Sequence, residues 1–227
     1  MSQQSEQKDA RLCAELQRDA MKHLEETATQ SLVYPQLDLE TLQIGVYPDA
    51  SHKRDSDSSQ CGYIILLGDS TKRANILHWN SAKPRRLTRS SLAAETAACI
   101  TAIDIATVMK FELENLLNAT VDMVVYTDSD SLFKLLTSTK MTTEKMLIFD
   151  INVIREKFDA FEVNNIALIS TTHQIADPLT KKMRSTHLTS AMNGYLAHPI
   201  TQWLTSFNEQ DSGGPSTSQK EEGRVSN

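Results

Sequence analysis

Cysteine is scarce in this sequence, and its positions exclude the common cysteine-based sites. Cys13, Cys61 and Cys99 are the only cysteines among 227 residues, and no two of them form a CxxC pair. A zinc site or a disulfide framework requires closely or regularly spaced cysteines, so neither is expected. Cys61 and Cys99 lie in apolar segments, where a free cysteine usually acts as a small buried hydrophobic residue. This usage is typical of a reducing compartment.

Long apolar segments are also lacking. No run of about 18 apolar residues occurs, so we expect no membrane-spanning segment and no membrane partner. The first residues are polar and lack the apolar centre of a signal peptide. With 40% hydrophobic residues, 227 residues suffice for one well-packed domain with appendages.

Positive charge is in deficit overall but concentrated locally. The net charge is −6, which argues against a protein that holds nucleic acid by overall charge alone. The segment 72–89, however, contains basic residues and no acid, and Trp79 lies within it. Such a run can be merely a solvated surface, or it can contact phosphates, with Trp79 either stacking on a base or packing in the core. The candidate nucleic-acid-binding residues are Lys83, Arg85, Arg86, Arg89 and Trp79.

Hydrophobic periodicity predicts an α/β protein with a mixed five-stranded sheet. Strands are expected at 42–47, 61–67, 74–79, 122–127 and 163–169. Helices are expected at 8–29, 90–117 with a break near Phe111, 128–136, 142–158 and, as a short turn, 177–183. Three antiparallel strands followed by strands reached through helical crossovers place helices on both faces of such a sheet.

The same pass along the chain predicts four segments. Residues 1–33 form an N-terminal helix, and 34–183 form the domain that contains the sheet. Residues 184–208 form a helical extension interrupted by Pro199. Residues 209–227 are rich in Gly, Ser, Glu and Lys, which predicts a disordered tail.

Acidic side chains stand at the ends of several predicted elements. Asp49 and Asp128 each stand at the end of an apolar strand, where open α/β sheets bind their ligands. Asp128 could instead cap the helix that it precedes. Asp177 follows the last strand and opens a helical turn, with Pro178 at a favourable first position.

Glu95 is the acid that is hardest to explain as a surface residue. It lies on the same helix face as Leu92 and Cys99, three residues after the first and four before the second. A buried, unpaired carboxylate would cost several kcal/mol or take up a proton. A metal ion or a pairing cation would remove this cost.

Carboxylate oxygens alone suit Mg²⁺ or Mn²⁺ better than zinc. Two such ions about 3.5–4 Å apart can clamp an in-line displacement at a phosphodiester. Bound cations are required in such a site, because a cluster of acids alone would repel the phosphate.

Four segments together resemble the ribonuclease H domain of copia-type LTR retrotransposon polyproteins. They are Val46–Ser51, Arg85–Thr96, Thr127–Phe133 and Ala176–Lys181, which occur in the order and approximate spacing of that family. The resemblance covers about residues 34 to 205.

The resemblance implies a ribonuclease H-like fold that hydrolyses the RNA strand of RNA–DNA hybrids. Asp49, Glu95, Asp128 and Asp177 would be the catalytic acids and would hold two Mg²⁺ (or Mn²⁺) ions. A reverse transcriptase domain or subunit would be the partner, and the helix at 8–29 resembles the end of the connection to it. A polymerase Tyr-x-Asp-Asp motif is missing from the sequence. The expected location is a cytoplasmic retroelement particle or the nucleus.

Several positions bear on how far the resemblance extends. Pro48, His52 and Met146 depart from the family's pattern and put substrate binding in question more than metal binding. His173 stands four residues before Asp177, where other ribonucleases H carry a histidine that assists product release; it can equally be an ordinary surface histidine.

Two other functions compete with the enzyme. An inactive ribonuclease H-like module could keep the fold and bind nucleic acid or a polymerase. A transposase or integrase core shares the general fold, but its glutamate comes last among the acids, whereas Glu95 comes second.

Overall fold

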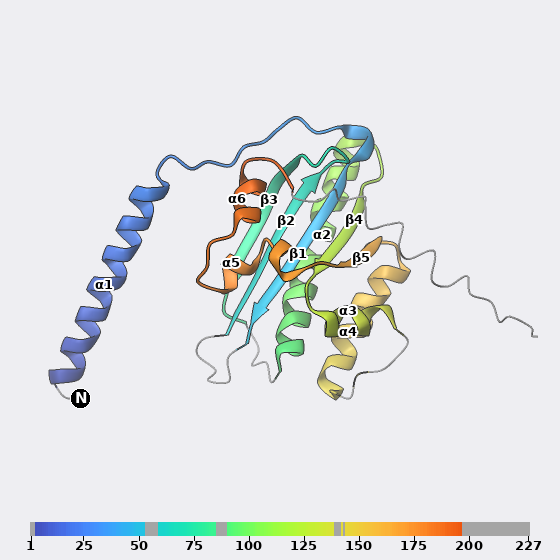
Figure 1. Cartoon of the computed structure of the whole chain (residues 1–227). Coiled ribbons are helices and arrows are strands. Elements are labelled where there is room, and N and C mark those ends of the chain that lie inside the picture. The colour runs from blue at the N-terminus through green and yellow to red at the C-terminus, as the bar shows by residue number, and fades with distance from the viewer. Residues whose placement is uncertain (1–2, 53–58, 85–89, 139–141, 143, 197–227) are drawn as a thin grey trace, which may run out of the picture. The chain divides into compact units, whose positions relative to one another are not determined.

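The computed structural model describes residues 3–52, 59–84, 90–138, 142 and 144–196 (Figure 1). The chain divides into two compact units, Met1–Val33 and Tyr34–Asn227. The first unit contains helix α1 (Gln3–Thr27), which both begins and ends earlier than the predicted 8–29. The predicted basic residues Arg85, Arg86 and Arg89, the interruption at Pro199 and the tail at 209–227 lie outside the described residues.

The second unit is built on a mixed five-stranded sheet. The strands are β1 (Gln43–Ser51), β2 (Gln60–Gly68), β3 (Ala74–Ala82), β4 (Asp122–Thr127) and β5 (Asn165–Leu168). Their order across the sheet is β3-β2-β1-β4-β5. The first three are antiparallel neighbours, whereas β4 runs parallel to β1 and β5 runs parallel to β4. The predicted α/β class and strand arrangement are confirmed.

Helices cover both faces of the sheet, as predicted (Figure 1). They are α2 (Ser91–Leu117), α3 (Asp130–Thr137), α4 (Lys145–Asp159), α5 (Asp177–Thr180) and α6 (Thr186–Met192). The main core lies between one face of the sheet and the helices α2, α3 and α4, and Tyr63 and Ile65 of β2 point into it. Gly62, the residue before Tyr63, faces α5 on the opposite side. The alternation of strand side chains therefore separates the two layers.

The core between the sheet and α2 combines large strand residues with small helix residues. Ile44, Val46 and Val125 are fully buried against the helix positions Cys99 and Ala102. Each buried Ile or Val contributes about 1.5–3 kcal/mol relative to an exposed side chain. Small residues on the helix allow its backbone to approach the sheet closely.

Helix α2 begins where the sequence predicts and continues without a break. Ser90 caps it by accepting a hydrogen bond from the Ala93 backbone N–H. The predicted break near Phe111 is wrong, because the helix continues to Leu117 and is capped by Asn118, which takes a left-handed conformation. By length and composition α2 could cross a membrane; a core helix passes the same test, and this one lies against the sheet.

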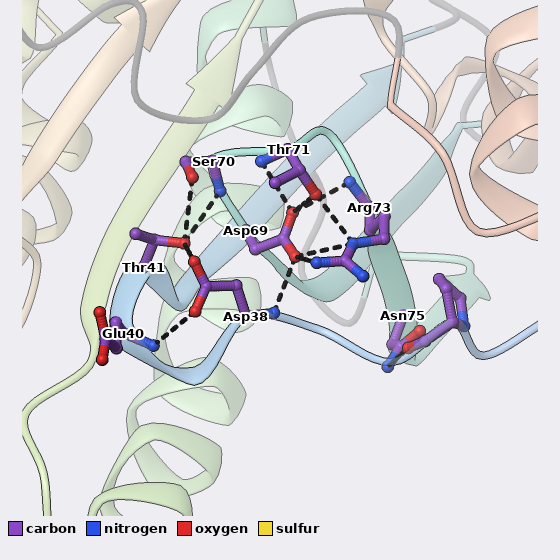
Figure 2. Close-up of polar contacts among 9 residues, drawn as sticks. Asp38, Glu40, Thr41, Asp69, Ser70, Thr71, Arg73 and Asn75 are labelled. Atoms are coloured by element: carbon purple, nitrogen blue, oxygen red, sulfur yellow. Dashed lines mark hydrogen bonds and ion pairs between the residues drawn. The ribbon is translucent and has the colours of Figure 1, made fainter.

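A buried carboxylate, Asp69, ties the β2–β3 turn to the segment before β1 (Figure 2). Its Oδ1 accepts hydrogen bonds from the backbone and hydroxyl of Thr71 and from the backbone of Arg73. Its Oδ2 accepts from the backbone N–H of Asp38 at 2.9 Å and pairs with the Arg73 guanidinium at 2.9 Å. Burial alone would raise the pKa of Asp69, but the hydrogen bonds from Thr71, Asp38 and Arg73 outweigh it and lower that pKa.

Candidate active site

The four candidate acids come from four different elements. Asp49 lies in β1, Glu95 in the second turn of α2, Asp128 directly after β4, and Asp177 at the first position of α5. The prediction that β1 ends at Pro48-Asp49 is wrong by two residues, because pairing with β2 continues to Ser51. The site is therefore assembled from segments far apart in the chain.

The parallel pairing of β1 and β4 explains why Asp49 and Asp128 lie at one edge of the sheet. Val46 is the register partner of Val125, and each acid follows three residues later. The capping role considered for Asp128 is wrong: the cap of α3 is Ser129, whose side chain accepts from the Leu132 backbone N–H. Asp128 is therefore available for another role.

Gly62 allows α5 to lie directly on β2. A Cβ atom at this position would be 2.8 Å from Leu179 Cβ and 2.9 Å from Thr180 Cγ2, distances that real side chains do not adopt. The preceding segment is fixed as well, because Gln174 Nε2 donates to the Pro48 carbonyl at 2.9 Å. These contacts place Asp177 and the end of α5 beside Asp49.

Two residues of the α5 region hold the Asp49 carboxylate. The Thr180 hydroxyl donates a short hydrogen bond to Asp49 Oδ2. The Lys181 ammonium lies 3.5 Å from Asp49 Oδ1 and 2.5 Å from Asp177 Oδ1. Burial raises the pKa of Asp49, in opposition to the hydrogen bond from Thr180 and the charge of Lys181, which lower it.

Glu95 is the acid with the most unfavourable surroundings. Burial, followed by the negative charges of Asp49 and Asp128, raises the pKa of Glu95 from 4.5 to about 8. Its Oε2 atom is buried and has no hydrogen-bond partner among the described residues. Glu95 thus lies near further acids without enough positive charge to offset their repulsion.

The donor set fits divalent cations by chemistry, although its side chains are not gathered around a common point. Within the described ranges, no three Asp, Glu, His or Cys side chains are arranged to hold a metal ion. Lys181 occupies the space between Asp49 and Asp177 instead. Carboxylate oxygens and an unpartnered buried oxygen are what Mg²⁺ or Mn²⁺ would require.

The other predicted site residues are dispersed. His173 ends a short 3₁₀ helix, η3 (Thr171–His173), and its ring lies 4.7 Å from that of His187, centroid to centroid. Trp79 of β3 is 54% exposed, and Lys83 is exposed just beyond that strand.

Sequence reasoning assigned no role to Gly62, Thr180 or Lys181, which position or contact the acids. A signal was present for Lys181, because it stands four residues after Asp177 and such pairs meet on a helical turn. No comparable signal in the sequence linked Gly62 to α5.

Neither the comparison with protein-family models nor that with curated proteins gives a match. Several solved structures are similar in fold. An RNase H1 from the halophilic archaeon Halobacterium salinarum NRC-1 is 18% identical, with a TM-score of 0.44 over 60% of this chain and 93% of that one. LC11-RNase H1, solved in complex with an RNA/DNA hybrid, is 19% identical, with a TM-score of 0.48 over 62% and 95%. The PFV RNase H domain is 16% identical, with a TM-score of 0.37 over 63% and 90%.

Proposed function

We propose that this protein is a ribonuclease H-like enzyme that hydrolyses the RNA strand of RNA–DNA hybrids. The observation that carries the proposal is the acid cluster around Glu95, whose buried Oε2 has no partner among the described residues. A protein tolerates such a group when it serves a ligand, and strongly perturbed carboxyl groups concentrate at functional sites. The four acids also coincide with the motifs that resemble copia-type ribonuclease H domains.

In this proposal Asp49, Glu95, Asp128 and Asp177 hold two divalent ions. When bound, the ions would supply an activated water and neutralise charge at the leaving 3′ oxygen. The protein's own contribution is positional: the sheet edge fixes Asp49 and Asp128, and α2 presents Glu95 from the neighbouring layer. Thr180 orients the Asp49 carboxylate through its hydroxyl.

The proposed substrate surface includes exposed Trp79 and Lys83, together with Arg85, Arg86 and Arg89. Basic side chains would contact phosphates of the hybrid, and Trp79 could stack on a base or sugar. Trp79 lies on the same sheet face as Asp49, because Ile64 pairs with Trp79 while Gly62 pairs with Asp49, two residues away. We further propose the retroelement context: a reverse transcriptase partner and a cytoplasmic particle or the nucleus as location.

An inactive, nucleic-acid-binding module is the second candidate function. It is favoured by one observation, the absence of a ligating arrangement of three such side chains in the described part of the chain. In such a protein the Lys181 ammonium would permanently take the place of a metal ion between Asp49 and Asp177. Activity measurements separate the two candidates.

The test compares wild type with Asp128→Asn on a labelled RNA–DNA hybrid in Mg²⁺ or Mn²⁺. We expect the variant to lose at least about 100-fold in cleavage rate, which corresponds to about 2.7 kcal/mol of transition-state stabilisation. Asp130→Asn is the matched control, because Asp130 is exposed and pairs only locally with Lys134; its rate should stay within about twofold of wild type. Equal inertness of wild type and Asp128→Asn would refute the enzyme and favour the binding module.

A further inference from the structure

The acid cluster contains a positive charge that belongs to the chain itself. Lys181 reaches Asp177 Oδ1 at 2.5 Å and Asp49 Oδ1 at 3.5 Å, so its ammonium bridges α5 and β1. The two carboxylates are almost completely enclosed, with exposed side-chain fractions of 4% and 1%. In the described residues, no other Lys or Arg side chain forms an ion pair with any of the four acids.

We propose that Lys181 is a built-in counterion that occupies the place of a divalent cation between Asp49 and Asp177 and is displaced when cations bind. The inference rests on the proposed function in taking these acids as the cation ligands. Lys181 would then stabilise the empty site and set the cation concentration at which it fills.

The structure supports displacement of Lys181 rather than of the acids. The Lys181 side chain is 41% exposed, so its ammonium can move into water by rotation about the bonds of its long side chain. Asp49 cannot move in the same way, because it lies within a paired strand and accepts a hydrogen bond from Thr180. Asp177 is fixed at the start of α5, which packs closely against the sheet because residue 62 is a glycine.

Charge balance explains why the empty site needs such a residue. Without cations, the Asp49 side chain and the Oε2 atom of Glu95 are buried near Asp128 and Asp177. Thr180 supplies a hydrogen bond to Asp49 but no charge. Lys181 offsets part of this repulsion. A divalent ion would offset more, but it must compete with the ammonium for the same oxygens, so Lys181 should weaken cation binding while it stabilises the cation-free protein.

The test measures binding of Mn²⁺ and Mg²⁺ by calorimetry at constant pH in the full chain, without nucleic acid. Lys181→Met should bind the first ion about tenfold more tightly than wild type, and Lys181→Arg, which keeps the charge, should bind as weakly as wild type. Lys182→Met is the matched control: it removes the same charge from an exposed neighbour that forms no ion pair with the described residues.

Thermal unfolding supplies a second readout of the same variants. In EDTA, Lys181→Met should melt about 3–6 °C below Lys182→Met, and saturating Mn²⁺ should remove most of this difference. If Lys181→Met does not fold in EDTA, folding on addition of Mn²⁺ would support the inference, and failure to fold at any Mn²⁺ concentration would overturn it.

The inference and the proposed function can fail separately. Tighter ion binding by Lys181→Met supports the counterion role even if no variant cleaves a hybrid. Cleavage by wild type that depends on Asp128, together with equal ion affinities for Lys181→Met and Lys182→Met, overturns the counterion role and leaves the enzyme intact. The absence of ion binding by every variant also overturns the inference.

Discussion

Asp69 and Glu95 each carry an enclosed carboxylate oxygen, but the groups around the two acids have opposite effects on their charge. Asp69 is fully enclosed, and each of its oxygens accepts several hydrogen bonds, including those from the guanidinium and backbone of Arg73 (Figure 2). Glu95, in contrast, carries a buried oxygen without a partner among the described residues and lies near further acids. The pKa of Asp69 is lowered, whereas that of Glu95 is raised to about 8.

The difference separates a carboxylate that stabilises the fold from one that we propose to serve the active site. Around Asp69 every neighbouring group favours the charged form, so the charge stabilises the fold by joining the β2–β3 turn to Asp38. Around Glu95 burial and like charges oppose the charged form, which costs stability unless a cation is supplied. Asp69 is fully buried and Glu95 only partly, but both carry an enclosed carboxylate oxygen, and the groups around that oxygen favour the charged form in one acid and oppose it in the other.

The largest effect expected is from Asp69→Asn. The amide would turn N–H groups toward the donors of Thr71, Asp38 or Arg73, and it would leave the Arg73 guanidinium without a counterion. We therefore expect the free energy of unfolding, measured with urea at pH 7, to fall by about 3 kcal/mol. Since the folded-state pKa of Asp69 is lowered, this contribution exists above the ordinary Asp pKa of 3.8. The difference from wild type should shrink as the pH falls below about 4. A loss that is constant from pH 7 to pH 3 would contradict this account.

Glu95→Gln should change the free energy of unfolding in the opposite direction, and stabilise the protein at high pH. Because the folded-state pKa of Glu95 is about 8 and its ordinary value is 4.5, the folded protein retains a proton that the unfolded chain releases between these values. The contribution of Glu95 to stability therefore declines as the pH rises through this interval. At pH 8 in EDTA, Glu95→Gln should be about 2 kcal/mol more stable than wild type, with no difference below about pH 4.5. A variant less stable than wild type at pH 8 would show that Glu95 is a structural acid like Asp69.

Gly62→Ala should have the smallest effect on stability but should act selectively on the acid cluster. The added methyl group would press on Leu179 and Thr180, so we expect a loss of about 1–2 kcal/mol and weaker binding of Mn²⁺ as α5 moves from Asp49. Gly45→Ala is the control, because its methyl group would press on Leu66 and Tyr47 instead. It should lower stability without changing ion affinity; equal ion affinities for both variants would show that the position of α5 does not matter to the site.

Local patterns were sufficient for most of the fold. Alternation in β1 and the apolar run of β4 predicted strands, and Ser90 predicted the start of α2. Two details of the prediction were wrong. The break near Phe111 was expected from the sequence, but α2 continues through this residue to Leu117. Asp49 was expected at the end of its strand, which in fact continues to Ser51 because pairing with β2 extends it.

The candidate site was predictable in its residues and unpredictable in its contacts. Glu95 was identifiable from its place on an apolar helix face, and the other acids from strand ends and the family resemblance. The contact of Thr180 with Asp49 joins residues far apart in the chain, and the packing of α5 on Gly62 depends on the path of the whole C-terminal segment. Neither follows from periodicity.

The sequence by itself therefore determined the strand and helix order and the identity of the acids, since both depend on residue type and spacing along the chain. Only the tertiary structure decided which acids share a charge environment, and that Lys181 lies between Asp49 and Asp177. The physical reason is that burial and Coulomb interactions depend on distances in space. The neighbours of Asp69 in the fold lower its pKa and those of Glu95 raise it, and these neighbours come from segments far apart in the chain.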